Sequence, residues 1–183
     1  MNKIIAIVGM CGSGKSVASD YLENTLGYHK VYFGGVTMKK LQEANLEINP
    51  ENEKMMREKL RKELGMGAYA KVLLPEIKEL SEKGDVVLDG LYSWTEYQIL
   101  IKEIPNLILI SIVADKKLRY ERLSQREIRP LTCEEARKRD LSEIENIEKA
   151  PPIAYADYYI FNNGTIEEYL DRLNEILQEI SNN

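Results

Sequence analysis

Glycine, lysine and serine residues at fixed spacing near the start of the chain are the groups best suited to chemistry. The stretch Gly9-Met10-Cys11-Gly12-Ser13-Gly14-Lys15-Ser16 follows the pattern G-x-x-x-x-G-K-S, in which a glycine-rich backbone can approach a diphosphate closely. Lys15 is expected to reach the β- and γ-phosphates, and the Ser16 hydroxyl is expected to bind Mg²⁺. The pattern predicts that the loop from Gly9 to Val17 binds a nucleotide.

The loop has the flanking elements that this motif requires. The apolar run Lys3–Val8 predicts a buried strand before it, and the spacing of apolar residues from Val17 to Leu26 predicts a helix after it. The unpaired N–H groups and the positive dipole end of that helix would face the phosphates. A glycine-rich turn that matches the motif by chance is therefore the less favoured interpretation.

Strand and helix patterns alternate to the end of the chain. Further strands are expected at 31–33, 86–88, 107–113 and 158–161. This alternation predicts a single α/β domain over residues 1–183, with three α/β/α layers around a five-stranded parallel sheet and ligands at the carboxyl ends of the strands. The helix in excess of simple crossovers falls at about 36–80 and 122–150, so these segments are expected to form lobes beside the loop.

Prolines and capping pairs set the expected helix ends. Asn49-Pro50 predicts a helix start, Pro75 is expected to interrupt the helix at 68–80, and the charged helix after the strand at 107–113 is expected to break near Pro130. Three pairs have the spacing of a capping box, namely Ser93 with Glu96, Thr132 with Glu135, and Thr165 with Glu168.

An acidic residue ends the expected strand at 86–88. Asp89 is followed by Gly90 and would lie at the carboxyl edge of the sheet, beside the loop. A carboxylate there can hold Mg²⁺, directly or through water, whereas the alternative is a simple Asp-Gly turn. With the phosphate-binding loop in place, the magnesium role is favoured.

Arginines cluster after the fourth strand. The spacing of Arg119, Arg122 and Arg126 predicts that the three lie on one helix face, and Arg129 precedes Pro130. In most proteins such a run is a solvated face neutralised by nearby glutamates. Phosphoryl transfer needs cations over the migrating charge, and guanidinium groups suit phosphate oxygens. Arg122, Arg126 and Arg129 are therefore assigned to catalysis.

The first lobe holds candidate contacts for a phosphoryl acceptor. Arg57 and Arg61 lie one helical turn apart, and either clamp an acceptor phosphate or pair with neighbouring glutamates. The sequence supports these two alternatives equally. Tyr92, just after Asp89, is another residue that either lines an acceptor pocket or packs in the core.

Composition limits the remaining function classes. A net charge of −5 and a pI near 5.2 give no basic field for a nucleic-acid polymer. The first apolar run is too short for a signal peptide or a membrane span, so a cytoplasmic location with no membrane partner is expected. Cys11 and Cys133 are too few for a disulfide framework. Cys11 is either a small filler of the loop, the favoured alternative, or a reactive thiol.

The chain resembles the P-loop kinases of nucleotides and related small molecules, most of all the dephospho-CoA kinase-like and adenylate kinase-like group. The resemblance is carried by Gly9–Ser16, Asp89-Gly90-Leu91, Arg119–Arg126, Arg139-Asp140 and Ala156–Thr165. It implies ATP and Mg²⁺ as cofactors, an acceptor-binding lobe at 36–80 and a lid at 122–140. It also implies an adenine seated between a lid arginine and the turn after the last strand, which makes Arg122, Asn162, Gly164 and Thr165 nucleotide contacts. A turn and helix cap alone would also explain that last segment.

One departure from these kinases concerns the acceptor. Dephospho-CoA kinases have an aspartate just after the second strand, proposed to orient the acceptor hydroxyl, and this chain has Gly34-Gly35 there. Gly35 is nevertheless kept as a candidate substrate contact, with Arg57, Arg61 and Tyr92.

Together these observations predict an ATP- and Mg²⁺-dependent kinase of a small phosphorylated or nucleotide-like acceptor, with dephospho-CoA and a nucleoside monophosphate as the first acceptors to test. The chain is expected to be a monomer or small homo-oligomer. The alternative is a P-loop ATPase or nucleotide-dependent switch that acts through a protein partner. The lid arginines favour the kinase, and the missing aspartate favours the switch.

Overall fold

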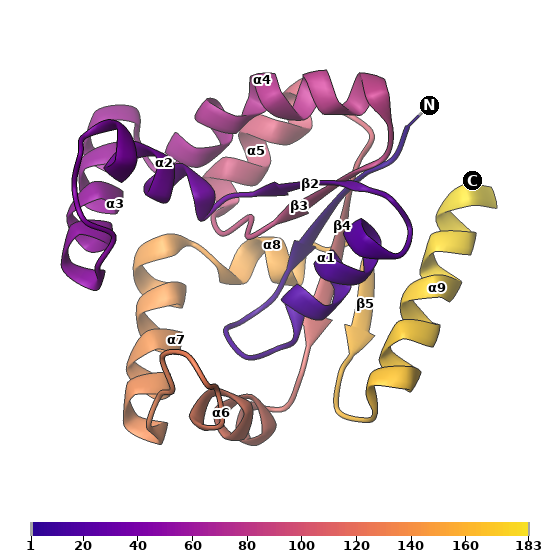
Figure 1. The fold of residues 1–183 in the computed structure, drawn as a ribbon. Coiled ribbons are helices and arrows are strands. Elements are labelled where there is room, and N and C mark those ends of the chain that lie inside the picture. Colours follow the sequence, from indigo (N-terminus) through magenta and orange to yellow (C-terminus); the bar gives the residue numbers. More distant parts are fainter. Residues whose placement is uncertain (1, 183) are drawn as a thin grey trace.

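The computed structural model describes residues 2–182, and a parallel sheet forms its centre. The strands are β1 (Ile4–Val8), β2 (His29–Tyr32), β3 (Val86–Asp89), β4 (Leu107–Val113) and β5 (Tyr158–Phe161). They are arranged in the order β2-β3-β1-β4-β5, and all neighbours run parallel (Figure 1). The predicted five-stranded parallel sheet is confirmed, and β2 begins slightly earlier than the predicted strand.

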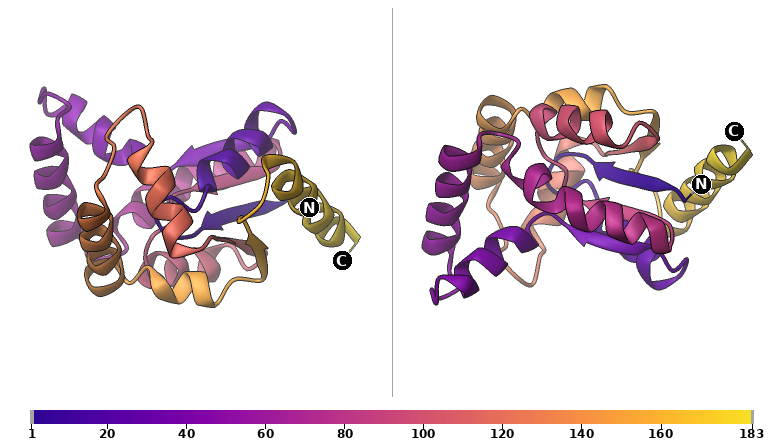
Figure 2. Two further views of the ribbon diagram at one scale, coloured as in Figure 1. Left: turned by 90° about the horizontal axis from the view of Figure 1, so that it is seen from below. Right: turned by 90° about the horizontal axis from the view of Figure 1, so that it is seen from above.

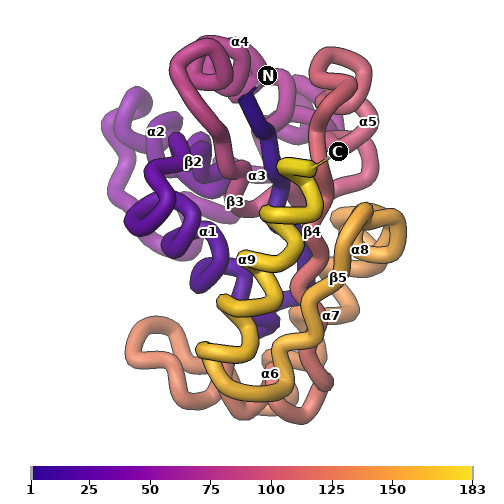
Figure 3. Tube along the Cα trace, turned by 90° about the vertical axis from the view of Figure 1, so that its right-hand side faces the viewer, coloured from indigo at the N-terminus to yellow at the C-terminus, as the bar shows by residue number. Residues whose placement is uncertain are grey.

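Helices cover both faces of this sheet. They are α1 (Lys15–Asn24), α2 (Gly35–Glu43), α3 (Pro50–Leu64), α4 (Ala68–Lys83), α5 (Trp94–Glu103), α6 (Lys116–Ser124), α7 (Cys133–Ile147), α8 (Ala150–Ala154) and α9 (Ile166–Asn182). Figure 3 shows α1 and α9 as neighbours, with α5 and α8 across the sheet from them. None of the helices in residues 2–182 is long and apolar enough to cross a membrane.

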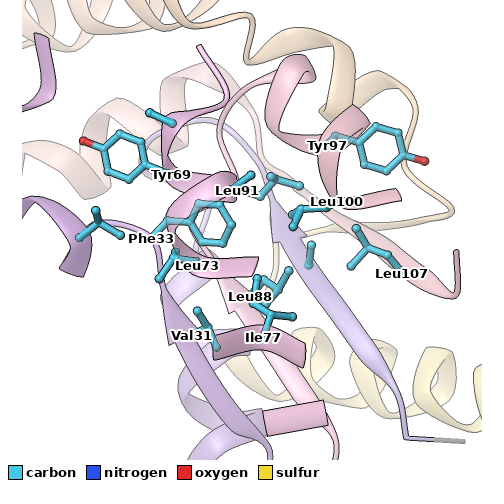
Figure 4. Packing of buried hydrophobic residues seen from close by; sticks show 14 of the residues in the cluster. Val31, Phe33, Tyr69, Leu73, Ile77, Leu88, Leu91, Tyr97, Leu100 and Leu107 are labelled. Carbon is cyan, nitrogen blue, oxygen red and sulfur yellow. The ribbon is translucent and has the colours of Figure 1, made fainter. Parts of the chain in front are cut away.

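The central strand β1 divides the core into two layers. Ile4, Ala6 and Val8 pack on the side of α4 and α5, whereas Ile5 and Ile7 pack on the side of α1 and α9. Because both faces are covered, all five residues of β1 are buried, as a parallel strand requires. Figure 4 shows the first layer, in which Phe33 packs beside Leu73 and Leu88.

The additional helices lie beside the carboxyl ends of the strands. In Figure 1, α2 and α3 stand at the upper left and α6 and α7 below them, on the side opposite α9. Both views of Figure 2 also place α3 and α9 at opposite ends of the molecule. The segments expected to form lobes therefore flank the edge where a parallel sheet binds ligands.

The predicted helix starts are confirmed at several positions. Asn49 accepts a hydrogen bond from the Asn52 N–H, with Pro50 as the first helical residue. Ser93 with Glu96 and Thr132 with Glu135 form complete capping boxes. Glu168 N–H likewise donates to the Thr165 hydroxyl.

Two expectations about prolines were wrong. Pro75 does not interrupt α4, because the buried side chains of Tyr69, Leu73 and Ile77 hold the helix against the sheet despite the missing donor. Helix α6 ends at Ser124, well before Pro130. The Leu131 N–H donates to the Leu123 carbonyl, and this hydrogen bond closes the loop that follows the helix. Arg126 therefore lies beyond α6 and not on the same helix face as Arg119 and Arg122.

Candidate active site

Side chains from distant parts of the chain fix the phosphate-binding loop. Arg119 donates to the Cys11 carbonyl at 2.8 Å, Asn162 Nδ2 to the Ser13 carbonyl at 2.8 Å, and the Tyr169 hydroxyl to the Gly14 carbonyl at 3.0 Å. These donors belong to α6, the segment after β5, and α9. The loop carbonyls are thus held by the scaffold, and α1 begins directly after the loop.

Two glycines of the motif are required by this close packing. Gly12 has φ +81°, and a Cβ there would lie 2.7 Å from the Arg119 carbonyl oxygen. Gly14 has φ +98°, and a Cβ there would lie 2.3 Å from Asn162 Nδ2. A larger residue at either position would strain the backbone and push away a group that anchors the loop.

Lys15 begins α1 and folds back over the loop. Its Nζ donates to the Met10 carbonyl at 3.0 Å. Burial of the ammonium group, and next the nearby positive charge of Lys149, lower the pKa of Lys15 to about 7. Without an anion the site therefore holds an incompletely stabilised cation, which the β- and γ-phosphates of a nucleotide would stabilise.

Asp89 and Ser16 face a common cavity of about 400 Å³. The Asp89 carboxylate is buried, accepts a hydrogen bond from the Ser19 hydroxyl at 3.0 Å, and lies 3.9 Å from Lys30 Nζ. Residues 2–182 contain no group of three or more metal-binding side chains that could hold an ion unaided. Mg²⁺ commonly takes one or two protein oxygens and completes its shell with phosphate and water, so these residues fit the ion only together with a nucleotide.

The three predicted catalytic arginines point to different partners. Arg122 donates a hydrogen bond to the side-chain Oδ1 of Asn162 at 3.3 Å, and Arg126 Nη1 lies 3.9 Å from the Cys11 sulfur. Arg129 instead crosses to α3, where it forms a two-point ion pair with Glu53 at 2.9 and 3.3 Å. Arg122 and Arg126 are thus at the phosphate-binding loop, and Arg129 joins the two lobes.

Asn162 links Arg122 to the loop through hydrogen bonds at both ends of its amide. Thr165 caps α9, and Gly164 packs against Glu168, where a Cβ would lie 2.0 Å from a carboxylate oxygen. The turn and cap are therefore present, and the adenine contact of these residues stays a prediction. Cys11 is buried against Leu123 and Ala136, as expected of a small filler.

A second cavity, of about 460 Å³, lies between the two lobes. We call it the acceptor cavity; its charged and tyrosine lining residues are Tyr32, Glu53, Arg57, Arg61, Tyr69, Tyr92, Arg129, Arg139 and Glu143. Three of the four predicted substrate residues, Arg57, Arg61 and Tyr92, line this cavity. Gly34 also lines it, whereas Gly35 lines a neighbouring cavity of about 320 Å³. The Arg61 Nε is buried and hydrogen-bonds to no other group in residues 2–182.

The sequence analysis missed an ionic group beside this cavity, in which Glu143 and Lys149 are buried and Arg139 is half exposed. Lys149 Nζ donates to Glu143 Oε2 at 2.6 Å, and Arg139 Nε donates to Glu143 Oε1 at 3.1 Å. Lys149 also stands 5.0 Å above the centre of the Tyr92 ring. Only the spacing of Arg139 and Glu143, one helical turn apart, could have suggested a pair, and it does not indicate that the pair faces inward.

Comparisons with known proteins agree with this arrangement. A family model described as an AAA domain matches residues 5–148. A UPF0200 protein of Aeropyrum pernix is 35% identical over 166 residues, which cover 90% of this chain and 87% of the relative. A UPF0200 protein of Sulfurisphaera tokodaii is 35% identical over 182 residues, which cover 97% of each chain.

Solved structures share the fold at low identity. A shikimate kinase from Bacteroides thetaiotaomicron has a TM-score of 0.64 and 14% identity, and the match covers 97% of this chain and 99% of that one. A sugar kinase from Janibacter sp. has a TM-score of 0.60 and 12% identity, with 97% and 95% covered. These likenesses confirm the fold of a P-loop small-molecule kinase. With this fold, the chain belongs to the AAA domain family and to the UPF0200 proteins.

Proposed function

We propose that this protein is an ATP- and Mg²⁺-dependent phosphotransferase that acts on a small anionic acceptor, either phosphorylated or nucleotide-like. The observation that carries the proposal is the acceptor cavity, which is lined by arginines from both lobes and shares Tyr32 with the cavity of Ser16 and Asp89. A nucleotide switch that signals through a protein partner needs the loop but has no use for a cavity lined by four arginines.

The residues divide the work of transfer between them. The loop and Lys15 would hold the β- and γ-phosphates, and Ser16 and Asp89 would hold Mg²⁺, which when bound would neutralise charge on those phosphates. An oxygen of the acceptor, either an anionic phosphate oxygen or a hydroxyl oxygen that releases its proton to water, forms a bond to the γ-phosphorus. The bond from this phosphorus to the β–γ bridging oxygen breaks, and ADP leaves with that electron pair. Arg122 and Arg126 would stabilise the charge that moves during this exchange.

The charges of the acceptor cavity favour an anion. Its two carboxylates already have cationic partners, since Glu53 is paired with Arg129 and Glu143 with Lys149. Arg61, whose Nε has no partner in the described chain, remains to bind a phosphate, and Arg57, which shares Glu53 with Arg129 at 3.4 Å, adds a second positive charge. Dephospho-CoA and nucleoside monophosphates are the first candidates.

A panel of acceptors tests the proposal. ADP formation from ATP and Mg²⁺ is measured with and without each acceptor, and we expect one class to accelerate it. Arg61→Ala should raise the acceptor KM, whereas Arg172→Ala, which removes a half-exposed arginine of α9, should not. ADP formation that no small acceptor changes would contradict the kinase and favour an ATPase or switch.

The magnesium assignment has its own test. Asp89→Asn keeps the shape and the Ser19 partner but removes the charge. We expect it to raise the Mg²⁺ concentration needed for activity while leaving metal-free nucleotide binding unchanged. An unchanged magnesium titration would leave Asp89 as a turn residue.

A further inference from the structure

One side chain belongs to both cavities of the site. Tyr32, the last residue of β2, lines the cavity that holds Ser16 and Asp89, and it also lines the acceptor cavity with Arg57 and Arg61. Among residues 2–182, it is the only one that lines both. Tyr32 therefore stands where the acceptor cavity and the cavity of Ser16 and Asp89 adjoin.

The alternation of β2 explains how Tyr32 comes to lie there. Val31 and Phe33 are buried in the core layer under α4, so Lys30 and Tyr32 face the opposite side, toward α1. Lys30 is held by Asp20 at 2.5 Å and by Glu23 at 3.4 Å. Tyr32 follows this group in the strand and is 50% exposed, so part of its side chain is open to a ligand.

The Tyr32 ring packs against Gly34. A Cβ on Gly34 would lie 2.4 Å from both the Cζ and the hydroxyl oxygen of Tyr32, so the tip of the ring rests directly against the glycine backbone. The φ of Gly34 is −59°, which any residue can adopt, and the glycine is therefore needed for space and not for its backbone angle.

The groups around the hydroxyl belong to the acceptor cavity, which Tyr32 lines together with Tyr92 and Arg129. Burial, and next the neighbouring Tyr32, raise the pKa of the Tyr92 phenol. The Tyr32 hydroxyl can donate a hydrogen bond to an anionic oxygen that enters this cavity.

We propose that Tyr32 positions the acceptor for transfer: its hydroxyl donates a hydrogen bond to the acceptor, and its ring keeps water away from the γ-phosphoryl group. This role rests on the proposed phosphotransferase function. Removing the hydroxyl should affect the acceptor alone, whereas removing the ring should let water compete for the phosphoryl group.

The experiment compares acceptor phosphorylation with ATP hydrolysis in matched variants. Tyr32→Phe should raise the acceptor KM by about two- to tenfold, the usual effect of one hydrogen bond, and leave ATP binding unchanged. Tyr32→Ala should raise the share of ATP lost to hydrolysis by about tenfold or more, because the ring no longer excludes water. Tyr159→Phe, which removes an exposed phenol that donates to the Ala154 carbonyl, is the control and should change neither quantity.

Gly34→Ala tests the same contact from its other side. The new methyl group must displace the Tyr32 ring, so this variant should also increase hydrolysis, and it should have no added effect in the Tyr32→Ala background. Full additivity of the two substitutions would overturn the role of this contact.

The possible failures are distinguishable. If the unaltered protein phosphorylates no acceptor, the proposed function fails and this role with it. If it phosphorylates an acceptor, and Tyr32→Phe and Tyr32→Ala retain its acceptor KM and its share of hydrolysis, the role of Tyr32 alone is overturned.

Discussion

Two arginine–carboxylate pairs of the same geometry hold the two sides of the site, and they differ in burial. Arg119 and Asp140 join α6 and α7 beneath the phosphate-binding loop, with 8% and 10% of their side chains exposed. Arg129 and Glu53 join the 125–132 loop to α3 across the acceptor cavity, where the arginine side chain is 60% exposed and the glutamate 7%. The first pair also reaches the loop itself, through the Cys11 carbonyl.

From this difference we expect the nucleotide side to stay fixed and the acceptor side to open. A buried two-point pair is costly to break, because each group would be left without water or partner. In the second pair the cation is solvated and can exchange its partner for water at little cost, and the buried Glu53 carboxylate would keep Arg57 at 3.4 Å. Arg129 can therefore leave Glu53 when a ligand enters, whereas Arg119 cannot leave the loop.

Substitution of the two arginines is the strongest test of this comparison. Arg119→Ala should lower the free energy of unfolding by about 3–5 kcal/mol, because it leaves the Asp140 carboxylate buried without a cation and with only the Tyr120 hydroxyl as a partner. Arg129→Ala should lower it by about 1 kcal/mol or less, because Glu53 keeps Arg57 at 3.4 Å and the lost cation was exposed. Urea denaturation of both variants measures the difference. Equal losses would show that both sides are fixed alike.

Lys15→Ala should abolish most catalytic turnover without unfolding the phosphate-binding loop or the elements that hold it. We expect turnover to fall by about 10²–10³-fold, which is the usual effect of losing one preorganised group at the transition state. The thermal unfolding midpoint should stay near that of the unaltered protein. Lys102→Ala, at an exposed position of α5, is the control for loss of a lysine. Normal turnover in Lys15→Ala, on a proven acceptor, would contradict the assignment of Lys15.

The sequence predicted the fixed side better than the mobile one, for a physical reason. Local pattern is enough for the loop, its flanking elements and the capping boxes, since each depends on residues close in the chain. The contacts that hold the site together cannot be predicted from local pattern. Asn162 contacts Ser13, and Arg129 contacts Glu53, only after the sheet and lobes have formed. The early end of α6 and the burial of the Lys149 side chain against Glu143 likewise follow from tertiary packing.

Proton uptake at Lys15 gives a smaller effect. Without nucleotide, the pKa of Lys15 is about 7, so the ammonium loses its proton as the pH rises above that value. Bound phosphates favour the charged form and should return the pKa toward its ordinary value of about 10.4. ATP should therefore bind most tightly below pH 7. Above the pKa of Lys15 in the free protein, the affinity should fall by up to about tenfold for each pH unit.

Calorimetric titration with ATP between pH 7.5 and 9 measures this dependence. Buffers of different ionisation enthalpy should report the uptake of up to one proton on binding. In Lys15→Ala, ATP binding should lose this slope. The same slope in both proteins would assign the proton to another group.

Closure of the mobile side is the smallest effect and the last test of the comparison. If Arg129 exchanges Glu53 for a ligand, hydrogen exchange in residues 36–80 and 122–140 should slow several-fold only when an ATP analogue and an acceptor bind together, while exchange in β1 and α1 stays the same. Arg126 is exposed, and its guanidinium group lies near the Cys11 sulfur of the phosphate-binding loop. We expect it to act only in that closed state. Arg126→Ala should therefore lower the rate of the chemical step, measured in a single turnover, more than it weakens ATP binding, and Arg137→Ala, an exposed arginine of α7, should do neither. Equal exchange in the free and doubly liganded protein would mean that the lobes are already closed, and that the solvated Arg129–Glu53 pair is as permanent as the buried one.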